Sequence, residues 1–352
     1  MVLVLRPPVS LPAVSFASAD TDTLGCWHAE YATNPSVLAV LPAMTHMLSV
    51  SGLPGGLALQ KVGSVLLMVG EPLAPAWAWD RLVSALLMTT WSERTVPCFG
   101  PVNAAFEAML TTRGFTAVRL GSTPYIHLHN WPQSGNSGAA VRHARNRARR
   151  EDIVFSHIAP GQNASRSPAE QEYWHREVLA LSAEWQKGHR ASRPFHWIFD
   201  LQPLAFQEVK HYFEARRGGR LIGLIAASPL PGRASWYLED VLRSGDAPAA
   251  TGTALVAYAL DFFSTAGLSL VTLGGIPLSR MRDLATAEPG ALEKAVYYLR
   301  PLLSRLYSFD GLELFKRRFG PAHWEDEYIA LPAGLWPRVK VVVTIARLIL
   351  DI

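Results

Sequence analysis

The chain has 352 residues, more than the roughly 100 to 200 of a single domain, so two domains are expected. Hydrophobic residues make up 49% of the chain and charged residues only 18%, which excludes an intrinsically disordered protein. The net charge of +4 excludes a uniformly basic protein, and two cysteines, Cys26 and Cys98, exclude a disulfide framework.

The amino terminus lacks the features of a signal peptide. Its first residues, MVLVLRPPVSLPAV, have no cationic leader, and three prolines interrupt the short apolar run. No apolar run in the sequence reaches the roughly 20 residues that span a bilayer. We therefore expect a cytoplasmic protein and leave open a peripheral attachment to the inner face of the cell membrane.

The first half alternates apolar runs with segments of helical spacing. Strands are expected over residues 63–69, 95–99 and 115–120, and helices over 76–90 and 103–112. This alternation predicts a mixed α/β domain over residues 1–135.

The second half repeats the alternation after a basic connecting segment over residues 136–168. Helices are expected over 168–187, 252–266 and 292–307, and strands over 220–227, 234–239 and 268–273. Strand, loop, helix and strand in this order form a βαβ unit. We expect a second α/β domain over residues 169–335.

Residues 336–352 predict an amphipathic helix at the end of the chain. On a helical wheel, Lys340, Thr344, Arg347 and Asp351 form one polar stripe, and aliphatic residues fill the remainder. The helix would be about 24 Å long, shorter than the roughly 30 Å core of a bilayer. It either packs in the core or lies on a membrane surface.

Several common catalytic and metal-binding patterns are missing from the sequence. It contains no GxxxxGK[ST] or GxGxxG phosphate loop and no GxSxG nucleophile motif. His127 and His129 would share one strand face, but no further ligand at suitable spacing completes a metal set. The loop at 243–252 is either an anion site before a helix or an ordinary turn.

Two groups of charged residues remain as candidates. Five arginines within residues 142–150 form either a solvated helical face or a site for a polyanion. Asp240, Arg243 and Lys316 lie in segments that otherwise resemble core, where charge is rare without a partner or a function. These three are either a salt-bridge cluster or an active site.

The order of three segments resembles one known family. YLEDVLR at 237–243, LGGIPLS at 273–279 and GLELFKRRFGP at 311–321 are followed by Trp324 and Tyr328. They resemble the D-L-M-R, L-G-x-A-P-L and G-L-x-x-F-K-x-K-F-x-P segments of aminoacyl-phosphatidylglycerol synthases, the multiple peptide resistance factor family. RHARNRA at 142–148 is similar to the family's R-x-x-x-N-R-A element.

The resemblance covers roughly residues 30 to 332 and includes departures. Gly70-Glu71-Pro72 has Glu where the family has Asp, and Glu327 stands where a basic residue often precedes the tyrosine. One extra residue lies between Pro321 and Trp324. The multi-helix membrane module of many members is absent, so the chain looks like a stand-alone synthase domain.

The resemblance implies a fold, a reaction and a set of site residues. It implies an α/β fold of two tandem acetyltransferase-like (GNAT) domains, with aminoacyl-tRNA as donor, the hydroxyl of an anionic phospholipid such as phosphatidylglycerol as acceptor, and no cofactor. Asp240 would orient or deprotonate the hydroxyl, Arg243 would bind phosphate, and Lys316 would bind phosphate or stabilise the oxyanion. Substrate contacts would come from Arg142, Asn146, Arg147, Gly274, Gly275, Ser279, Arg318 and Trp324.

Two other interpretations stay open. The same fold could use an acyl-CoA donor, with its pyrophosphate on the loop at 243–252, although Asp246 stands where phosphate would lie. The chain could also be a non-catalytic module that docks on anionic membranes or RNA through residues 142–150. Neither the amino acid carried nor the oligomeric state is predicted.

Overall fold

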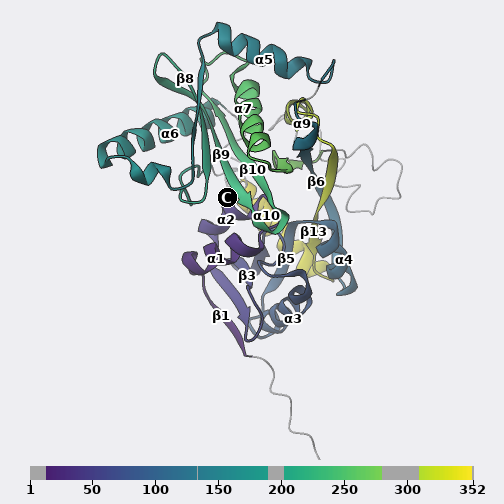
Figure 1. Ribbon diagram of the computed structural model, residues 1–352. Helices are drawn as coiled ribbons and strands as arrows, with labels where there is room; N and C mark the ends of the chain where they lie inside the picture. Colours follow the sequence, from purple (N-terminus) through teal and green to yellow (C-terminus); the bar gives the residue numbers. More distant parts are fainter. Residues whose placement is uncertain (1–12, 133, 189–201, 280–308, 351–352) are drawn as a thin grey trace, which may run out of the picture.

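A mixed sheet of thirteen strands runs through both halves of the protein (Figure 1). The computed structural model describes residues 13–132, 134–188, 202–279 and 309–350. The strand order is β1-β2-β3-β4-β5-β13-β6-β11-β10-β9-β8-β7, and the short β12 pairs with β6. Because strands of the two halves alternate at the centre of this order, the halves share one continuous sheet.

The first half contains six strands and four α-helices among the described residues. They are β1 (Val14–Ser18), α1 (Thr21–Tyr31), α2 (Val37–Val40), β2 (His46–Val50), β3 (Leu57–Val62), β4 (Val65–Met68), α3 (Ala76–Ser92), β5 (Val96–Val102), α4 (Ala104–Thr112) and β6 (Thr116–His127).

The rest of the chain comprises the connecting segment and the second half. Its elements are α5 (Ala139–Arg150), β7 (Val154–Ile158), α6 (Pro168–Gly188), β8 (His211–Arg217), β9 (Arg220–Leu230), β10 (Ser235–Arg243), α7 (Thr251–Thr265), β11 (Leu270–Thr272), β12 (Ile276–Pro277), α9 (Phe309–Arg317), β13 (His323–Leu331) and α10 (Leu335–Leu350). Short 3-10 turns occur at Leu128–Asn130 and Pro231–Arg233.

Helices cover both faces of the sheet in the first half. α3 and α4 bury Leu82, Leu86 and Phe106 against Phe99 on one face. α4 begins where sequence predicts, because the Asn103 side chain accepts a hydrogen bond from the backbone N–H of Phe106 at 3.0 Å. α10 packs on the opposite face, over β4 and β5.

The second half is layered in the same way. α5 and α7 cover one face, where Phe213, Leu255 and Phe263 are fully buried, and α6 covers the other face with Trp174 and Val178. Each half is thus a mixed sheet flanked by helices, as expected for two tandem GNAT-like domains, and the predicted α/β class is confirmed.

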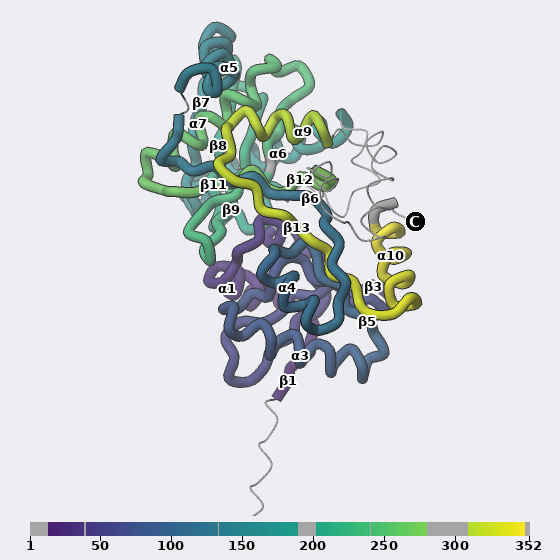
Figure 2. Tube along the Cα trace, turned by 90° about the vertical axis from the view of Figure 1, so that its right-hand side faces the viewer, coloured from purple at the N-terminus to yellow at the C-terminus, as the bar shows by residue number. Residues whose placement is uncertain are grey.

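β13 joins the two halves. It enters the sheet between β5 and β6, so a strand near the end of the chain completes the sheet of the first half. Figure 2 shows β13 and β6 side by side, running from α9 towards α10. The expected helix at 292–307 lies outside the described residues.

Candidate functional site

The turn after β11 places two glycines against β10 and β6. Gly274 has a φ of +78°, and a Cβ there would lie 2.4 Å from Cε2 of the Tyr237 ring, so only glycine fits. The hydroxyl of Ser279 accepts a hydrogen bond from the backbone N–H of Ser122 at 3.0 Å, which fixes the far end of the turn. The carbonyl groups of Gly274 and Gly275 are therefore held in place.

Lys316 places a buried ammonium group on this turn. It lies in the last turn of α9 and is 7% exposed. Its Nζ donates to the carbonyl oxygens of Gly274 at 2.8 Å and of Gly275 at 3.1 Å. Burial lowers the pKa of Lys316 from 10.5 to about 7, against the opposing effect of the Glu327 carboxylate. An ammonium has three N–H donors, so one remains beyond these two bonds.

Glu327 approaches the same turn from β13. Thr123 Oγ1 donates to Glu327 Oε1 at 2.7 Å, and Glu327 Oε2 lies 2.5 Å from the position that a Cβ on residue 275 would occupy. Glycine at position 275 therefore leaves room for this carboxylate. Burial raises the pKa of Glu327 from 4.5 to about 7; the charge of Glu71 adds to the rise, and Lys316 opposes it.

A small polar cavity between the two halves adjoins Glu327. Its lining residues are Thr33, Asn34, Pro35, Glu71, Asn103, Thr123, Tyr125, Arg233, Glu325, Asp326 and Glu327. Glu71 is 4% exposed and accepts hydrogen bonds from Thr33 Oγ1 at 2.9 Å and from the backbone N–H of Asn103 at 2.6 Å. Burial raises the pKa of the Glu71 carboxyl.

Two other carboxylates of the cavity have arginine partners. Arg233 pairs with Glu325 at 2.8 Å, and its guanidinium lies 5.0 Å from the centre of the Tyr125 ring. Arg119 pairs with Asp326 at 2.7 Å. The cavity therefore contains two compensated carboxylates, together with Glu71 and Glu327, which are held by hydrogen bonds.

β10 carries the predicted residues Asp240 and Arg243. The strand pairs with β11 at only two positions, and its register with β9 shifts between Leu238 and Asp240, so β10 bulges at Glu239. The backbone of Asp240 lies in the strand, and its side chain lies outside what the structure describes. Nη1 of Arg243 donates to the carbonyl oxygen of Ala247 at 2.7 Å, which holds the loop before α7.

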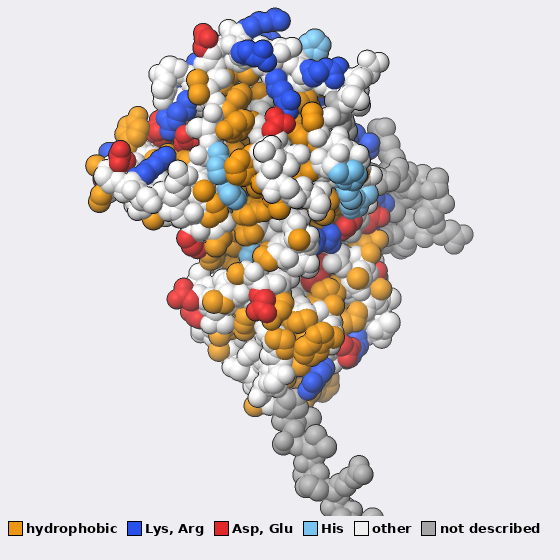
Figure 3. Space-filling view, in the orientation of Figure 1, with side chains coloured by type: hydrophobic (Ala, Val, Ile, Leu, Met, Phe, Trp, Pro, Cys, Tyr) orange, Lys and Arg blue, Asp and Glu red, His pale blue; other side chains and the backbone are white. Residues whose placement is uncertain are grey.

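The arginines of the basic run divide into one structural residue and an exposed face. Arg145 forms hydrogen bonds with both oxygens of Asp261 at 2.6 and 2.7 Å, which ties α5 to α7. Arg142, Asn146 and Arg147 are exposed, and Figure 3 shows Lys and Arg side chains gathered at the top of the molecule, over α5. These three predicted residues thus lie on a surface apart from the Lys316 turn.

The last two predicted residues lie next to α9. Arg318 is exposed in the turn after the helix. Trp324 lies on β13, and the guanidinium of Arg317 is 5.1 Å from the centre of its ring. Of the predicted site residues, the structure brings Lys316, Gly274 and Gly275 into direct contact.

Sequence reasoning did not select the acidic residues around the turn. Glu71 and Glu327 were noticed only as departures from a motif, and Arg233 and the pair Lys210 and Glu239 were not noticed. Lys210 and Glu239 form an ion pair whose side chains are 2% and 3% exposed, next to Asp240. The signal that could have found Glu71 and Glu327 is the departure itself, because each stands at a position where the family pattern has a different residue.

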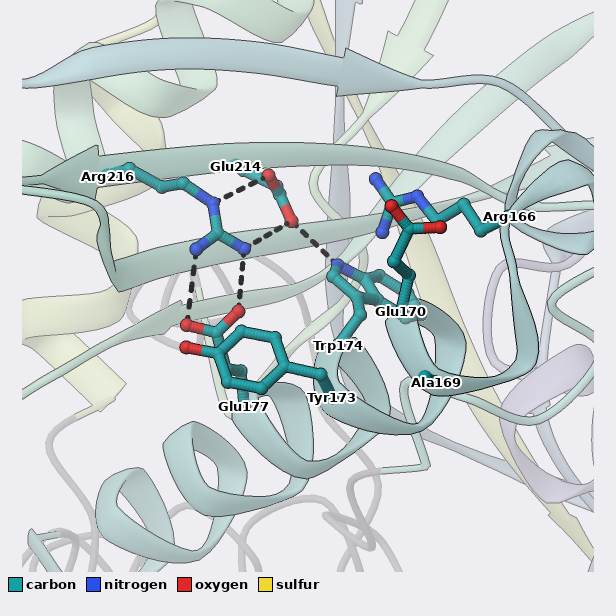
Figure 4. A pocket seen from close by; sticks show the side chains of 8 residues that line it. All are labelled: Arg166, Ala169, Glu170, Tyr173, Trp174, Glu177, Glu214 and Arg216. Atoms are coloured by element: carbon teal, nitrogen blue, oxygen red, sulfur yellow. Dashed lines mark hydrogen bonds and ion pairs between the residues drawn. The ribbon is translucent and has the colours of Figure 1, made fainter.

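A second, open pocket lies in the second half of the protein, between α6 and β8 (Figure 4). Arg216 donates to Glu177 at 2.8 Å and to Glu214 at 3.0 Å, and Nε1 of Trp174 donates to Glu214 at 2.6 Å. These charged groups compensate one another. None of the predicted site residues is among those that line this pocket.

The histidines do not form a metal site in the part of the chain that the structure describes, where no three His, Cys, Asp or Glu side chains could hold an ion. The expected shared strand face is wrong, because β6 ends at His127 and His129 lies in the following 3-10 turn. Nε2 of His127 lies 3.1 Å from Nδ1 of His323.

Comparison with protein families gives one match. Residues 30–331 match the model of the phosphatidylglycerol lysyltransferase C-terminal family. A comparison with curated proteins gives no match.

Solved structures give the same fold. The chain is similar to L-PGS from Bacillus licheniformis, with 19% identity, a TM-score of 0.74 and coverage of 95% of this chain and 98% of that one. The chain is also similar to the C-terminal domain of a lysylphosphatidylglycerol synthetase from Agrobacterium fabrum, with 17% identity and a TM-score of 0.72. The match covers 93% of this chain and 96% of that one. A conserved protein of unknown function from Bacteroides thetaiotaomicron has 12% identity and a TM-score of 0.60. The match covers 90% of this chain and 99% of that one.

Proposed function

Because the chain belongs to the phosphatidylglycerol lysyltransferase C-terminal family, whose members are transferases that aminoacylate lipid, we propose that it moves an amino acid from aminoacyl-tRNA to a hydroxyl group of phosphatidylglycerol. The observation that carries the proposal is the ammonium of Lys316, buried on the carbonyls of Gly274 and Gly275 beside Glu327. Acyl transfer needs a hydrogen-bond donor and a proton acceptor at one point, and this turn offers both.

The reaction is an exchange of one ester for another. The acceptor hydroxyl attacks the aminoacyl carbonyl, negative charge collects on the carbonyl oxygen, and the bond to the terminal ribose oxygen of the tRNA breaks. The third N–H of Lys316 would donate to that oxygen. The proposed position is favourable because the other two donors are already fixed by the turn, so the ammonium needs little reorganisation.

The proton of the acceptor hydroxyl needs a carrier with a pKa near neutrality. Glu327, whose pKa is raised to about 7, fits this requirement. It would take the proton from the attacking hydroxyl and return it to the leaving ribose oxygen, so that no net proton is gained or lost. Asp240 remains predicted to orient or deprotonate the same hydroxyl, and the test below separates the two assignments.

The tRNA would be held by the exposed face of α5. Arg142 and Arg147 are exposed there, with surface partners that phosphate oxygens would replace: Arg142 donates to the carbonyl oxygen of Gly135 at 2.6 Å, and Arg147 lies 3.6 Å from Glu151. Arg145 is engaged with both oxygens of Asp261. Arg243 remains a predicted phosphate ligand, and Arg318 remains a predicted substrate contact. RNA is negatively charged, and α5 carries arginines and no acidic residue, which supports this assignment.

The alternative acyl-CoA donor is disfavoured by the loop before α7. The backbone N–H of Gly245 donates to Glu184 Oε1 at 2.7 Å, and Asp246 pairs with Arg220 at 2.5 Å. A pyrophosphate would have to displace one carboxylate and lie beside another, which repels it. We therefore retain aminoacyl-tRNA as the proposed donor.

The decisive assay supplies the protein with a pool of charged tRNA carrying labelled amino acids and with phosphatidylglycerol vesicles, and identifies labelled lipid by mass spectrometry. Formation of aminoacyl-lipid that ribonuclease pretreatment abolishes would support the proposal. Activity that survives ribonuclease and requires acyl-CoA would favour the alternative donor. RNA or vesicle binding without any transfer would favour the non-catalytic module.

Three variants assign the roles. Lys316→Met should lower turnover by about 100- to 1000-fold, as expected for loss of an oxyanion donor. Glu327→Gln and Asp240→Asn are compared by their pH–rate profiles, because only the variant that removes the base loses the rise in activity through pH 7. Lys187→Met, on the exposed end of α6, is the control for loss of one positive charge.

A further inference from the structure

The outward face of α10 is apolar, which is unusual for a helix on the surface of a protein. Five large apolar residues on it are exposed: Leu335 by 73%, Trp336 by 76%, Val339 by 41%, Val342 by 49% and Val343 by 43%. They follow one another at helical spacings of three and four, so they form one continuous stripe along the helix. We call this set the outer stripe.

The outer stripe is not needed to hold α10 on the protein. The opposite side of the helix packs on the sheet, where Val341 is fully buried and Ile345 and Leu348 contact the same core cluster. At the start of the helix, Nε of Arg338 donates to the carbonyl oxygen of Pro332 at 3.0 Å. The helix is therefore anchored on its inner side, and the outer stripe stays exposed.

The charges of α10 indicate what covers the stripe. Residues 335–350 contain no Asp or Glu, and Lys340 and Arg347 are exposed. Trp336, Lys340, Val343 and Arg347 are spaced by four, three and four residues, so both cations lie beside the apolar residues. A second copy of the chain would have to place acidic groups against these cations, whereas an anionic lipid surface accepts apolar and cationic side chains together.

We propose that α10 is an interfacial helix that docks the protein on membranes containing anionic phospholipid. Its outer stripe enters the boundary between headgroups and acyl chains, Trp336 sits at the headgroup level, and Lys340 and Arg347 contact lipid phosphates. The helix lies flat, since in the described part of the chain no helix is long and apolar enough to span a bilayer. This docking goes beyond the proposed transfer reaction and holds whatever the donor is.

The position of α10 makes the docking distinct from RNA binding. Figures 1 and 2 both place α5 at one end of the molecule and α10 away from it, beside β4 and β5. The exposed arginines of α5 can thus face a tRNA while α10 rests on lipid.

The test is flotation of the full-length protein with vesicles of phosphatidylglycerol and phosphatidylcholine, compared with phosphatidylcholine alone. The wild type should float with the anionic vesicles. Trp336→Gln should lower the partition coefficient about tenfold, the loss expected for one large apolar side chain withdrawn from the interface. Lys340→Gln and Arg347→Gln should each lower it about fivefold on anionic vesicles and leave binding to neutral vesicles unchanged.

Trp91→Gln is the matched control, because Trp91 is 88% exposed on α3, which packs on the opposite face of the sheet from α10. It should bind vesicles as the wild type does. Equal flotation of the Trp336 variant and the wild type, or absence of wild-type flotation, would overturn the proposal. So would a wild-type dimer that Trp336→Gln dissociates without any vesicle binding, since the stripe would then be an interface between copies.

The outcome is independent of the transfer reaction. Activity with detergent-dispersed phosphatidylglycerol is measured for the same variants. A variant that no longer floats but keeps this activity supports the docking role of α10, whereas loss of transfer with intact flotation would contradict the proposed function alone.

Discussion

Replacing Lys316 with methionine should change how the stability of the protein depends on pH. The amine is 7% exposed, and its pKa is about 7 in the folded protein instead of 10.5. Between these values the unfolded chain binds about one proton more than the folded chain, so the wild-type free energy of unfolding rises with pH by about 1.4 kcal/mol per pH unit. Methionine does not titrate, so the variant lacks this contribution.

The sign follows from the buried ammonium. At the lower end of the window, folding must either bury the charged ammonium or remove a proton that the unfolded chain keeps, and both lower the stability. This penalty disappears as the pH rises and the unfolded amine also loses its proton. Over the whole window the free energy of unfolding rises by about 5 kcal/mol, and from about pH 7.5 to about 9.5 it rises by about 3 kcal/mol.

Urea unfolding followed by tryptophan fluorescence measures the effect. The quantity of interest is the free energy of unfolding of the wild type minus that of Lys316→Met, because titrating groups that do not interact with Lys316, such as Tyr125 with its raised pKa, cancel in the difference. The difference should rise steadily with pH. If it stays flat, the Lys316 ammonium is in contact with water and the buried site is refuted.

Four further substitutions test the site and its surroundings. Gly274→Ala forces a side chain into a left-handed backbone and against an aromatic ring, so the free energy of unfolding should fall by about 2 kcal/mol or more in urea titrations. Arg145→Ala breaks the pair with Asp261 and should lower stability by up to about 1 kcal/mol, whereas Arg142→Ala should leave thermal stability unchanged and weaken tRNA retention on filters. Glu327→Gln should lower kcat about 100-fold or more and remove the rise in rate through pH 7; an unchanged pH–rate profile would exclude it as the base.

The regular helices are the part of the fold that sequence predicts best. The helix expected at 76–90 is α3 (Ala76–Ser92), and the helix expected at 252–266 is α7 (Thr251–Thr265). Helical spacing of apolar residues is a local property, so a single sequence is enough to detect it.

β13 was not predicted, because its place in the sheet is not a local property of its sequence. Its sequence, HWEDEYIAL, begins with polar and charged residues and lacks the apolar run of a central strand. Its place in the sheet depends on β6, where Glu327 lies opposite Gly121, about two hundred residues earlier in the chain. Pairing over such a separation leaves no trace in local periodicity.

The candidate site shows the same limit. The order of motifs was enough to predict that Gly274, Gly275 and Lys316 belong together, and the structure has them within hydrogen-bond distance. Glu327 could not be chosen in this way, because its hydrogen bond with Thr123 joins residues 204 positions apart. The environment that raises its pKa exists only in the folded protein.

The two acidic departures from the family pattern lie in one electrostatic environment. Arg233 and Arg119 pair with the neighbouring carboxylates Glu325 and Asp326. The charges that act on Glu327 include those of Glu71, Lys316 and Glu325. Burial and the charge of Glu71 both oppose ionisation of Glu327, while Lys316 favours it. Near neutral pH the carboxyl of Glu327 therefore exchanges readily between its two protonation states. A group proposed to accept a proton and return it within one turnover needs this property, and here burial of Glu327 is its main cause.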